Sequence, residues 1–212
     1  AGTAHGTGNT SSVNSSKLAR IDGGADAPGY LTEKANVYLD EVIGKLHISG
    51  NVTKEEIQAY AQDERVVQVQ ADIGTVLPQN CSELFQGFGA QTFNLKNADA
   101  SNVTTMYGMF SGCKNATLFD LSGLDTSNVT GMSSMFANCE SASRIYLNGW
   151  DTRKVTNMNY MFLSCLELRT LDVSGFDTSN VTSMSLTFCH CESLTNLNLI
   201  GWDTSSVTNM NG

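Results

Sequence analysis

Apolar residues recur along this chain with a period of 26 residues. Residues 93–196 divide without gaps into four blocks of that length, and the second block, FDLSGLDTSNVTGMSSMFANCESASR, shows the pattern. A fifth block begins at residue 197 and is incomplete at residue 212. A strict period of roughly 20 to 50 residues is typical of a solenoid, in which each block forms one coil and equivalent side chains stack in columns.

Two segments of each block predict secondary structure. At the start of a block apolar and polar residues alternate, as Phe93 and Leu95 do around Asn94, and this is the period of a β-strand. Between residues 103 and 113 the apolar residues follow spacings of three, four and three, which predict inward-facing helical turns. The sequence therefore predicts an α/β solenoid on the leucine-rich-repeat plan. We expect a right-handed coil with a parallel β-sheet on one face and short helical or 3₁₀ turns on the other.

Three regions follow from this organisation. Residues 1–16 are almost entirely Gly, Ser, Thr, Asn and Ala, so they cannot bury enough apolar surface to fold, and we expect a flexible polar tail. Residues 93–212 form the repeat array, with four full repeats and a partial fifth. Because an open solenoid end would expose its core, residues 17–92 are predicted to form an N-terminal helical cap with a degenerate first repeat.

The cap contains several short patterns. Residues 32–46 place four apolar side chains on one helical face, and Thr53 with Glu56 forms a capping box before a second apolar pattern, so we expect two short helices. Residues 66–70 alternate like a strand. Residues 81–88, CSELFQGF, look like a degenerate copy of the MFxxC segment of the repeats.

The repeat consensus carries a family resemblance. The motif DTSNVTxMxxMFxxC, preceded by GTVLPQNCSELF at residues 74–85, resembles the bacterial BspA-like leucine-rich-repeat surface proteins over about residues 46–212. The resemblance implies an extracellular or cell-surface location and an adhesin-like role toward a partner protein. It implies no catalytic residues.

Charge and composition exclude several functions. Twenty-one acidic residues against twelve basic ones give a formal net charge of −9, which argues against nucleic acid and anionic lipid as partners. No apolar run is long enough to insert into a membrane. His5, His47 and His190 have no patterned nucleophile or carboxylate partner, and there is no glycine-rich phosphate loop. We therefore expect neither an enzyme nor a cofactor.

An aspartate follows each predicted strand. These residues are Asp99, Asp125, Asp151, Asp177 and Asp203. Each carboxylate could accept backbone N–H bonds in an Asx-turn, or the column could bind calcium. The first interpretation is favoured because the motif lacks the additional acidic ligands of calcium loops, so we predict no metal site.

Other columns have structural and functional interpretations. Four cysteines share one column and are expected to be small buried hydrophobes: Cys113, Cys139, Cys165 and Cys191. Cys81 and Cys189 lie outside it, where a disulfide or a reactive thiol remains open. The column of Trp150, Trp202, Phe176 and Leu124 fits core packing better than an exposed aromatic stripe. The threonine columns are better explained by hydrogen bonds to the backbone of the coils than by binding to ice.

The best candidate for a binding site is the outward face of the strands. Its side chains differ between blocks while their inward neighbours stay apolar, so packing does not dictate them. The predicted ligand-binding residues are Asn94, Lys96, Asp120, Tyr146, Asn148, Asp172 and Asn198. We expect them to recognise an extracellular protein or glycan.

Two further expectations concern modification and assembly. Asn102, Asn128 and Asn180 each begin the sequon N-V-T, which permits N-glycosylation where a host provides the machinery. The incomplete fifth block suggests an alternative function, in which the chain is a structural subunit. It would then form a homo-oligomer head to tail through its open C-terminal coil, as a filament or a surface layer.

Overall fold

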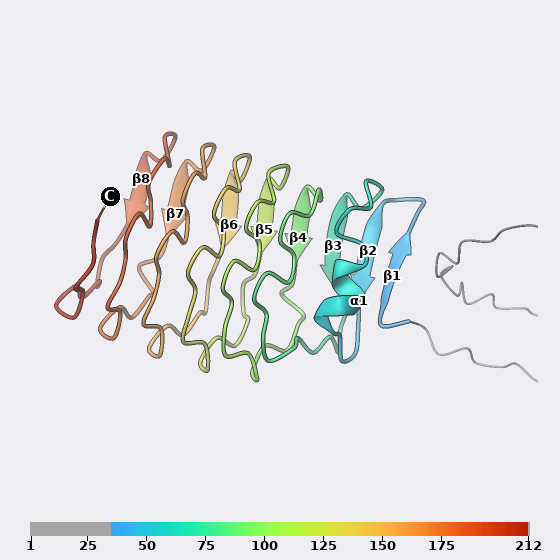
Figure 1. Ribbon diagram of the computed structural model, residues 1–212, viewed down its shortest axis with the longest axis horizontal. Helices are drawn as coiled ribbons and strands as arrows, with labels where there is room; N and C mark the ends of the chain where they lie inside the picture. The colour runs from blue at the N-terminus through green and yellow to red at the C-terminus, as the bar shows by residue number, and fades with distance from the viewer. Residues whose placement is uncertain (1–34, 212) are drawn as a thin grey trace, which may run out of the picture. The chain divides into compact units, whose positions relative to one another are not determined.

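The computed structural model describes residues 35–211, so the predicted tail and the beginning of the predicted cap lie outside the described residues. From Asn36 onward the chain forms one solenoid of parallel coils (Figure 1). This confirms the solenoid predicted from the period. No helix within residues 35–211 has the length and apolar content needed to cross a bilayer.

Short strands, one per coil after an initial hairpin, make up the sheet face of the solenoid. They are β1 (Val37–Asp40), β2 (Lys45–Ile48), β3 (Gln68–Ala71), β4 (Thr92–Asn94), β5 (Leu118–Asp120), β6 (Arg144–Tyr146), β7 (Thr170–Asp172) and β8 (Asn196–Asn198). Strand β1 pairs antiparallel with β2, and the later pairings are parallel. Thr92 pairs with Leu118 and Leu118 with Arg144, so neighbours in the sheet are one 26-residue block apart.

Stacked columns of identical side chains fill the core. Five phenylalanine rings follow one another with centroids 5.4–5.6 Å apart and planes within 9° of parallel. They are Phe85, Phe110, Phe136, Phe162 and Phe188. Phe93 and Phe119 stack in the same way on the strand side, at 5.1 Å. Because each ring buries its faces against the rings above and below, a coil obtains its core from its neighbours.

The predicted helical or 3₁₀ turns are wrong. Opposite the sheet, two positions of each turn segment between residues 81 and 191 have positive φ, near +57° at Gly108 and +74° at Gly112 in the first repeat. The equivalent residues in the other coils are Glu83, Gly87, Ser134, Asn138, Tyr160, Ser164, Leu186 and His190. The N–H of Gly108 donates to Ser133 of the next coil, 2.9 Å away, instead of to its own turn. The chain therefore turns corners here and bonds between coils, because the left-handed residues interrupt any right-handed helix.

The predicted helical cap is also wrong in its first half. Residues 32–46 do not form a helix where the structure describes them: β1 and β2 form a hairpin whose turn ends at Gly44, with φ of +64°. Val42, which the helical pattern placed on the inner face, is 93% exposed in this turn. The residues that cover the end of the core alternate with period two instead, as Val37 and Leu39 do on β1.

The rest of the cap agrees with the sequence patterns. Helix α1 (Lys54–Gln58) begins after the predicted capping box, in which Thr53 N–H donates to Glu56 Oε2 at 2.8 Å and Glu56 N–H donates to Thr53 Oγ1 at 3.2 Å. Strand β3 forms within two residues of the predicted segment 66–70. Residues 81–88 occupy the same turn position as the MFxxC segments, because Phe85 begins the phenylalanine column.

Candidate functional site

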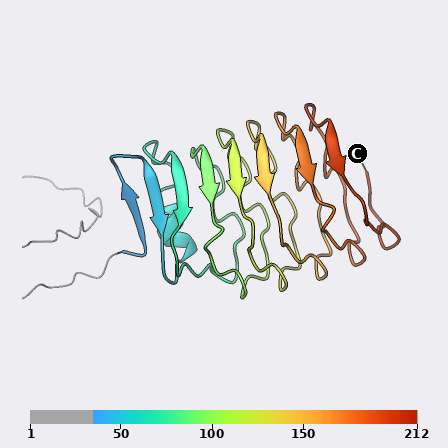
Figure 2. The ribbon, with the colours of Figure 1, turned by 180° about the vertical axis from the view of Figure 1, so that it is seen from behind.

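The outward face of the strands brings the predicted binding residues together. On each strand the central residue, such as Phe119 or Ile145, points into the core, so its two neighbours point outward. Parallel register places Asn94 beside Asp120 and Asp120 beside Tyr146. In the second sheet Asp172 lies beside Asn198. Lys96 and Asn148 follow two residues after their strands' outward residues and are exposed. Figure 2 shows the strands side by side across this face.

The sheet is interrupted in the middle of this face. Within the described chain, β1 to β6 form one sheet and β7 pairs only with β8, so no ladder joins β6 to β7. At the other junctions between coils, a backbone hydrogen bond joins the residues that lie just before the two strands. Examples are the bonds from Ser143 N–H to Thr117 O at 3.1 Å and from Thr195 N–H to Arg169 O at 3.0 Å. No equivalent bond joins Arg169 to Ser143 among the described residues. On the opposite face the same two coils stay joined, since Thr182 N–H donates to Thr156 O at 2.9 Å.

A shallow hollow of ≈ 710 Å³ opens at this interruption. Both guanidinium-bearing residues of the strand face, Arg144 and Arg169, line it. The ring of Tyr146, which is 45% exposed, contributes an apolar surface with a polar tip. Asn148 and Asp172 add an amide and a carboxylate. The hollow is therefore a mixed polar and aromatic surface with charges of both signs.

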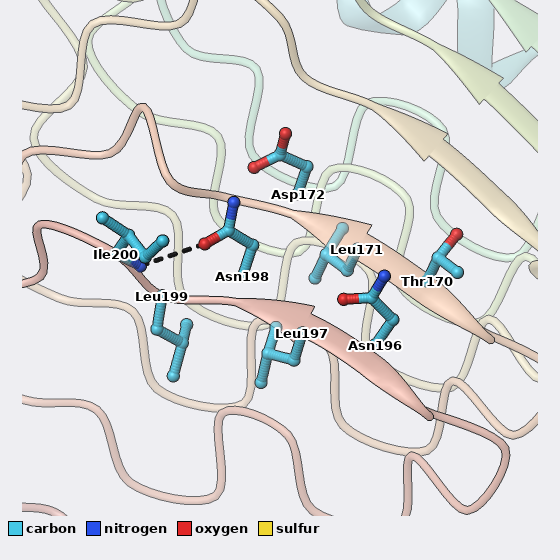
Figure 3. Close-up of a pocket in the computed structure, with 8 residues that line it drawn as sticks. All are labelled: Thr170, Leu171, Asp172, Asn196, Leu197, Asn198, Leu199 and Ile200. Atoms are coloured by element: carbon cyan, nitrogen blue, oxygen red, sulfur yellow. Dashed lines mark hydrogen bonds between the residues drawn. The ribbon is translucent and has the colours of Figure 1, made fainter.

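A second hollow of ≈ 650 Å³ adjoins it between β7 and β8 (Figure 3). Thr170 and Asp172 from β7 and Asn196 and Asn198 from β8 supply its polar groups. The Oδ1 of Asn198 accepts a bond from Ile200 N–H at 3.2 Å, which holds that side chain against its own turn. Since Asp172 lines both hollows, they form one continuous surface over the last three strands.

Hydrogen bonds fix the carboxylates of this surface. Asp172 Oδ1 accepts from Ser174 Oγ at 2.7 Å and from Ser174 N–H at 3.0 Å, and these bonds hold the pKa of Asp172 below its usual range. Asp120 accepts from the hydroxyl of Ser122 at 2.6 Å in the same way. Both carboxylates are therefore held in one orientation by a serine hydroxyl.

The four arginines of residues 35–211 fall into two groups. Arg65 and Arg153 form close ion pairs with Asp63 and Asp151, each at 2.6 Å. Across residues 35–211, Arg144 and Arg169 form no such pair and no side-chain hydrogen bond. Within the described part of the chain, the unpaired guanidinium groups are thus those at the interruption of the sheet.

The aspartate column forms Asx-turns. Asp125 Oδ1 accepts from Ser127 N–H at 3.0 Å, and the same bond forms at each of the other four positions. Hydrogen bonds from the residue two positions later lower the pKa of all five carboxylates. Arg153 adds an ion pair and lowers the pKa of Asp151 to about 2. In the described part of the chain, no group of three or more His, Cys, Asp or Glu residues is arranged to hold a metal ion.

The cysteine column consists of free thiols that link neighbouring coils. Cys139 Sγ donates to Phe110 O at 3.2 Å, and Cys165 Sγ donates to Phe136 O at 3.3 Å. Burial raises the pKa of Cys113 to about 12 and that of Cys139 well above its ordinary value. Cys81 is a free buried thiol and Cys189 a free, partly buried one, so neither forms the disulfide that the sequence left open.

The aromatic and threonine columns have structural roles. Trp150 is buried, stacks on Phe176 at 6.2 Å, and donates from Nε1 to Leu121 O at 2.9 Å, so this column is core and not an exposed stripe. Thr126 is buried between coils: its hydroxyl donates to Asp151 O at 2.9 Å and accepts from Asp151 N–H at 2.8 Å. The three sequon asparagines, Asn102, Asn128 and Asn180, are exposed.

One contact on this face was missed by sequence reasoning. The sequence predicts no carboxylate partner for His47 on β2, and this is wrong: its Nδ1 lies 3.0 Å from Asp72 Oδ1. The ring of His47 also stacks on Tyr38 with centroids 4.8 Å apart. The spacing of these residues does not follow the 26-residue period because the first coils differ in length, so the repeat gave no signal. No nucleophile accompanies the pair in a described contact.

Comparison with known proteins identifies one family. The family model described as Mycoplasma protein of unknown function, DUF285, matches residues 79–170 and again 141–212. These matches span the repeats and the turn segment that precedes them. No curated protein and no solved structure matches the chain.

Proposed function

The chain belongs to the DUF285 family, which is described as of unknown function, and we propose that it is a non-catalytic binding module. Its strand face would recognise a protein or glycan partner outside the cell or at the cell surface, in an adhesin-like role. The observation that carries the proposal is the contrast between the two sides of each strand. The inward residues of β4 to β7 are uniformly apolar and buried, whereas the outward ones change from Asn94 to Asp120 to Tyr146 along one column.

The outward positions of the strands are free to vary in a way that the core positions are not. Side chains that pack in the core are restricted by volume, but those on the solvent side of a rigid sheet are not. The carboxylates of Asp120 and Asp172 are nevertheless held in place by serine hydroxyls, so a partner would meet preorganised groups. The resemblance of the repeats to BspA-like leucine-rich-repeat surface proteins supports the location and the role.

A triple substitution tests the proposal. The purified chain is applied to arrays of glycans and of immobilised extracellular proteins, and any ligand it retains is then titrated. Changing Asp120, Tyr146 and Asp172 to Ala is expected to weaken that binding at least about tenfold, because these residues supply the central polar and aromatic contacts of the face.

The matched control lies on the other side of the coils. Thr130, Thr156 and Thr182 form an exposed column whose hydroxyls bond only to carbonyls of the preceding coil. Changing them to Ala should leave the affinity unchanged. The proposal fails if the strand-face variant binds as the wild type does, or if the threonine variant loses the ligand instead.

A second candidate function is head-to-tail assembly, and exposed apolar groups favour it. Beyond β8, Ile200 is 78% exposed and Met210 is 56% exposed, and the outer edge of β8 has no partner strand within residues 35–211. A further coil stacked there would cover these groups. Sedimentation of the 212-residue chain tests this: assembly predicts mass that rises with concentration, and Ile200→Lys with Met210→Lys should abolish the rise. A monomer at every concentration would contradict it.

A further inference from the structure

Arg144 and Arg169 stand out among the charged groups of this acidic chain. Both line the hollow where β6 and β7 separate, and neither has an ion-pair partner among the described residues. The carbonyl of Ser143 and the N–H of Arg169 are also left without the backbone bond that the neighbouring junctions form. Planar guanidinium groups donate paired hydrogen bonds that match a carboxylate. The hollow thus presents two guanidinium groups that pair with no carboxylate of residues 35–211 and can receive an anionic group from a ligand.

We propose that this hollow binds a carboxylate-bearing saccharide, such as a sialic or uronic acid unit of a glycan. The guanidinium groups of Arg144 and Arg169 hold the carboxylate. The exposed ring of Tyr146 packs against the apolar face of the sugar ring, and Asn148 and Asp172 bond to its hydroxyls. This inference rests on the proposed binding function of the strand face and names its ligand class.

A saccharide fits the hollow better than an acidic peptide does. The acceptor groups Asp172 and Glu167 lie beside the arginines and would repel the several carboxylates of an acidic peptide, but they accept bonds from the hydroxyls of a sugar. The hollow is open and shallow, and its core-facing residues, Ile145 and Leu147, are nearly buried, at 7% and 5% exposure. It therefore offers no deep apolar pocket for a peptide side chain.

Titrations followed by NMR test the assignment. The labelled chain is titrated with sialyllactose, with a glucuronic-acid-containing oligosaccharide, with neutral lactose and with an acidic peptide. We expect one or both acidic sugars to bind and to shift the Nε–Hε signals of Arg144 and Arg169. The two acidic sugars distinguish the sources of the carboxylate. Lactose and the peptide should produce no shift.

Single substitutions locate the site. Arg144→Ala and Arg169→Ala should each weaken binding of the acidic sugar by about tenfold, because each removes a charge-assisted hydrogen bond. Arg144→Lys should restore part of the loss, since it keeps the charge and loses the paired donors. The control is Arg153→Ala, which removes an exposed arginine that already pairs with Asp151 and should leave binding unchanged.

Several outcomes would overturn the assignment. If lactose binds as tightly as the acidic sugars, the carboxylate has no role in recognition. If only the peptide binds, the ligand is not a saccharide. If Arg153→Ala weakens binding as much as Arg144→Ala does, the effect comes from the overall charge of the protein and not from this hollow. If no acidic sugar binds but Asp120, Tyr146 and Asp172 are required for another ligand, the saccharide assignment fails while the proposed function stands. If the strand face is required for no ligand, the proposed function fails as well.

Discussion

Single polar side chains fasten one coil to the next. Buried hydroxyl and thiol groups bond to main-chain groups of neighbouring coils, as Thr126 does with Asp151 and Cys113 does with Phe85 O, at 3.0 Å. Such groups would be costly inside a core if they had no partner. Within residues 35–211 no buried side-chain N or O atom lacks a hydrogen bond. The need for hydrogen bonds between coils therefore explains the repeated Thr and Cys residues without a binding site.

The Thr126 hydroxyl gives a prediction about stability. Thr126→Val keeps the shape of the side chain but removes a donor to Asp151 O and an acceptor for Asp151 N–H. We expect the free energy of unfolding to fall by about 1–3 kcal/mol, because buried main-chain groups lose their partner. Urea unfolding measures this. The control is Thr130→Val, at an exposed position of the same coil, which should change the free energy of unfolding by less than about 0.5 kcal/mol. Equal losses in the two variants would contradict the role of the buried hydroxyl.

Buried thiols predict instability at alkaline pH. Burial raises the pKa of Cys113 to about 12, whereas an unfolded thiol titrates near roughly 8.5, so only the unfolded chain loses its proton between these values. The buried neutral thiol therefore makes its full contribution to the free energy of unfolding below pH ~8.5, and this contribution is lost as the pH rises toward the pKa of the folded state.

The Cys113→Ala variant measures this effect. Above pH ~9 under reducing conditions, the unfolding free energy of the wild type should fall faster than that of the variant, by a difference approaching about 1.4 kcal/mol per pH unit. Urea unfolding at several pH values between 7 and about 10.5 measures how the unfolding free energy of each protein changes with pH. Parallel slopes would show that the folded thiol ionises as readily as the unfolded one.

At the scale of elements, the sequence predicted positions better than conformations. The period placed Phe110 and Phe136 in one column and the strands in register, because stacked coils force equivalent residues together. The spacings within residues 103–113 suggested a helix because a chain that turns a corner also buries every third or fourth residue. What separates the two cases is the left-handed backbone at two positions per coil, and residues as different as Gly108 and Tyr160 occupy one of them.

The same limits apply to the cap and to the candidate site. Residues 32–46 satisfy a helical pattern and an alternating one, and the hairpin prevails because β1 and β2 extend the sheet over the end of the core. The outward residues could be predicted from alternation alone. The interruption between β6 and β7 could not, since the 26-residue spacing continues unchanged across it. The contact of His47 with Asp72 lies outside the period altogether.

The left-handed positions give a prediction at this scale. A Cβ at Gly108 would meet ordinary neighbours at 3.5 Å or more, so space is not the limit there, but its φ of +57° disfavours a β-branched residue. Gly108→Val is therefore expected to lower the free energy of unfolding by about 1–2 kcal/mol. Gly131→Val is the control, because Gly131 has no positive φ and the nearest atom to its Cβ is 3.9 Å away.

The matched pair separates backbone strain from loss of glycine as such. Gly131→Val should stay within about 0.5 kcal/mol of the wild type in the same chemical unfolding measurement. The reverse substitution is Ser134→Gly, at the position equivalent to Gly108, where the serine has a positive φ. It removes the backbone strain of that serine, so any loss in the free energy of unfolding should not exceed the entropic cost of glycine, about 1 kcal/mol. Equal losses in Gly108→Val and Gly131→Val would exclude backbone strain as the cause.

At the scale of the whole array, each coil depends on its immediate neighbours. The long-range backbone bonds run from one coil to the next, as those of Thr130 to Thr104 and of Thr156 to Thr130 do, so cohesion is nearly one-dimensional. The interruption between β6 and β7 removes strand-side bonds from one junction while the turn side keeps its own. That junction can therefore present backbone groups and unpaired arginines to a ligand without opening the core.

One-dimensional cohesion predicts that a whole coil can be removed. Deleting residues 119–144, one full 26-residue block, joins Leu118 to Ile145 and leaves every later residue in its own column. The shortened chain should fold and unfold cooperatively, with a denaturant m-value lower by about one seventh because less surface is exposed on unfolding. Deleting only residues 119–131 removes half a period and would turn polar residues into the core. That chain should show no cooperative transition by circular dichroism. A folded half-block variant, or an unfolded full-block variant, would mean that contacts other than those between adjacent coils hold the array together.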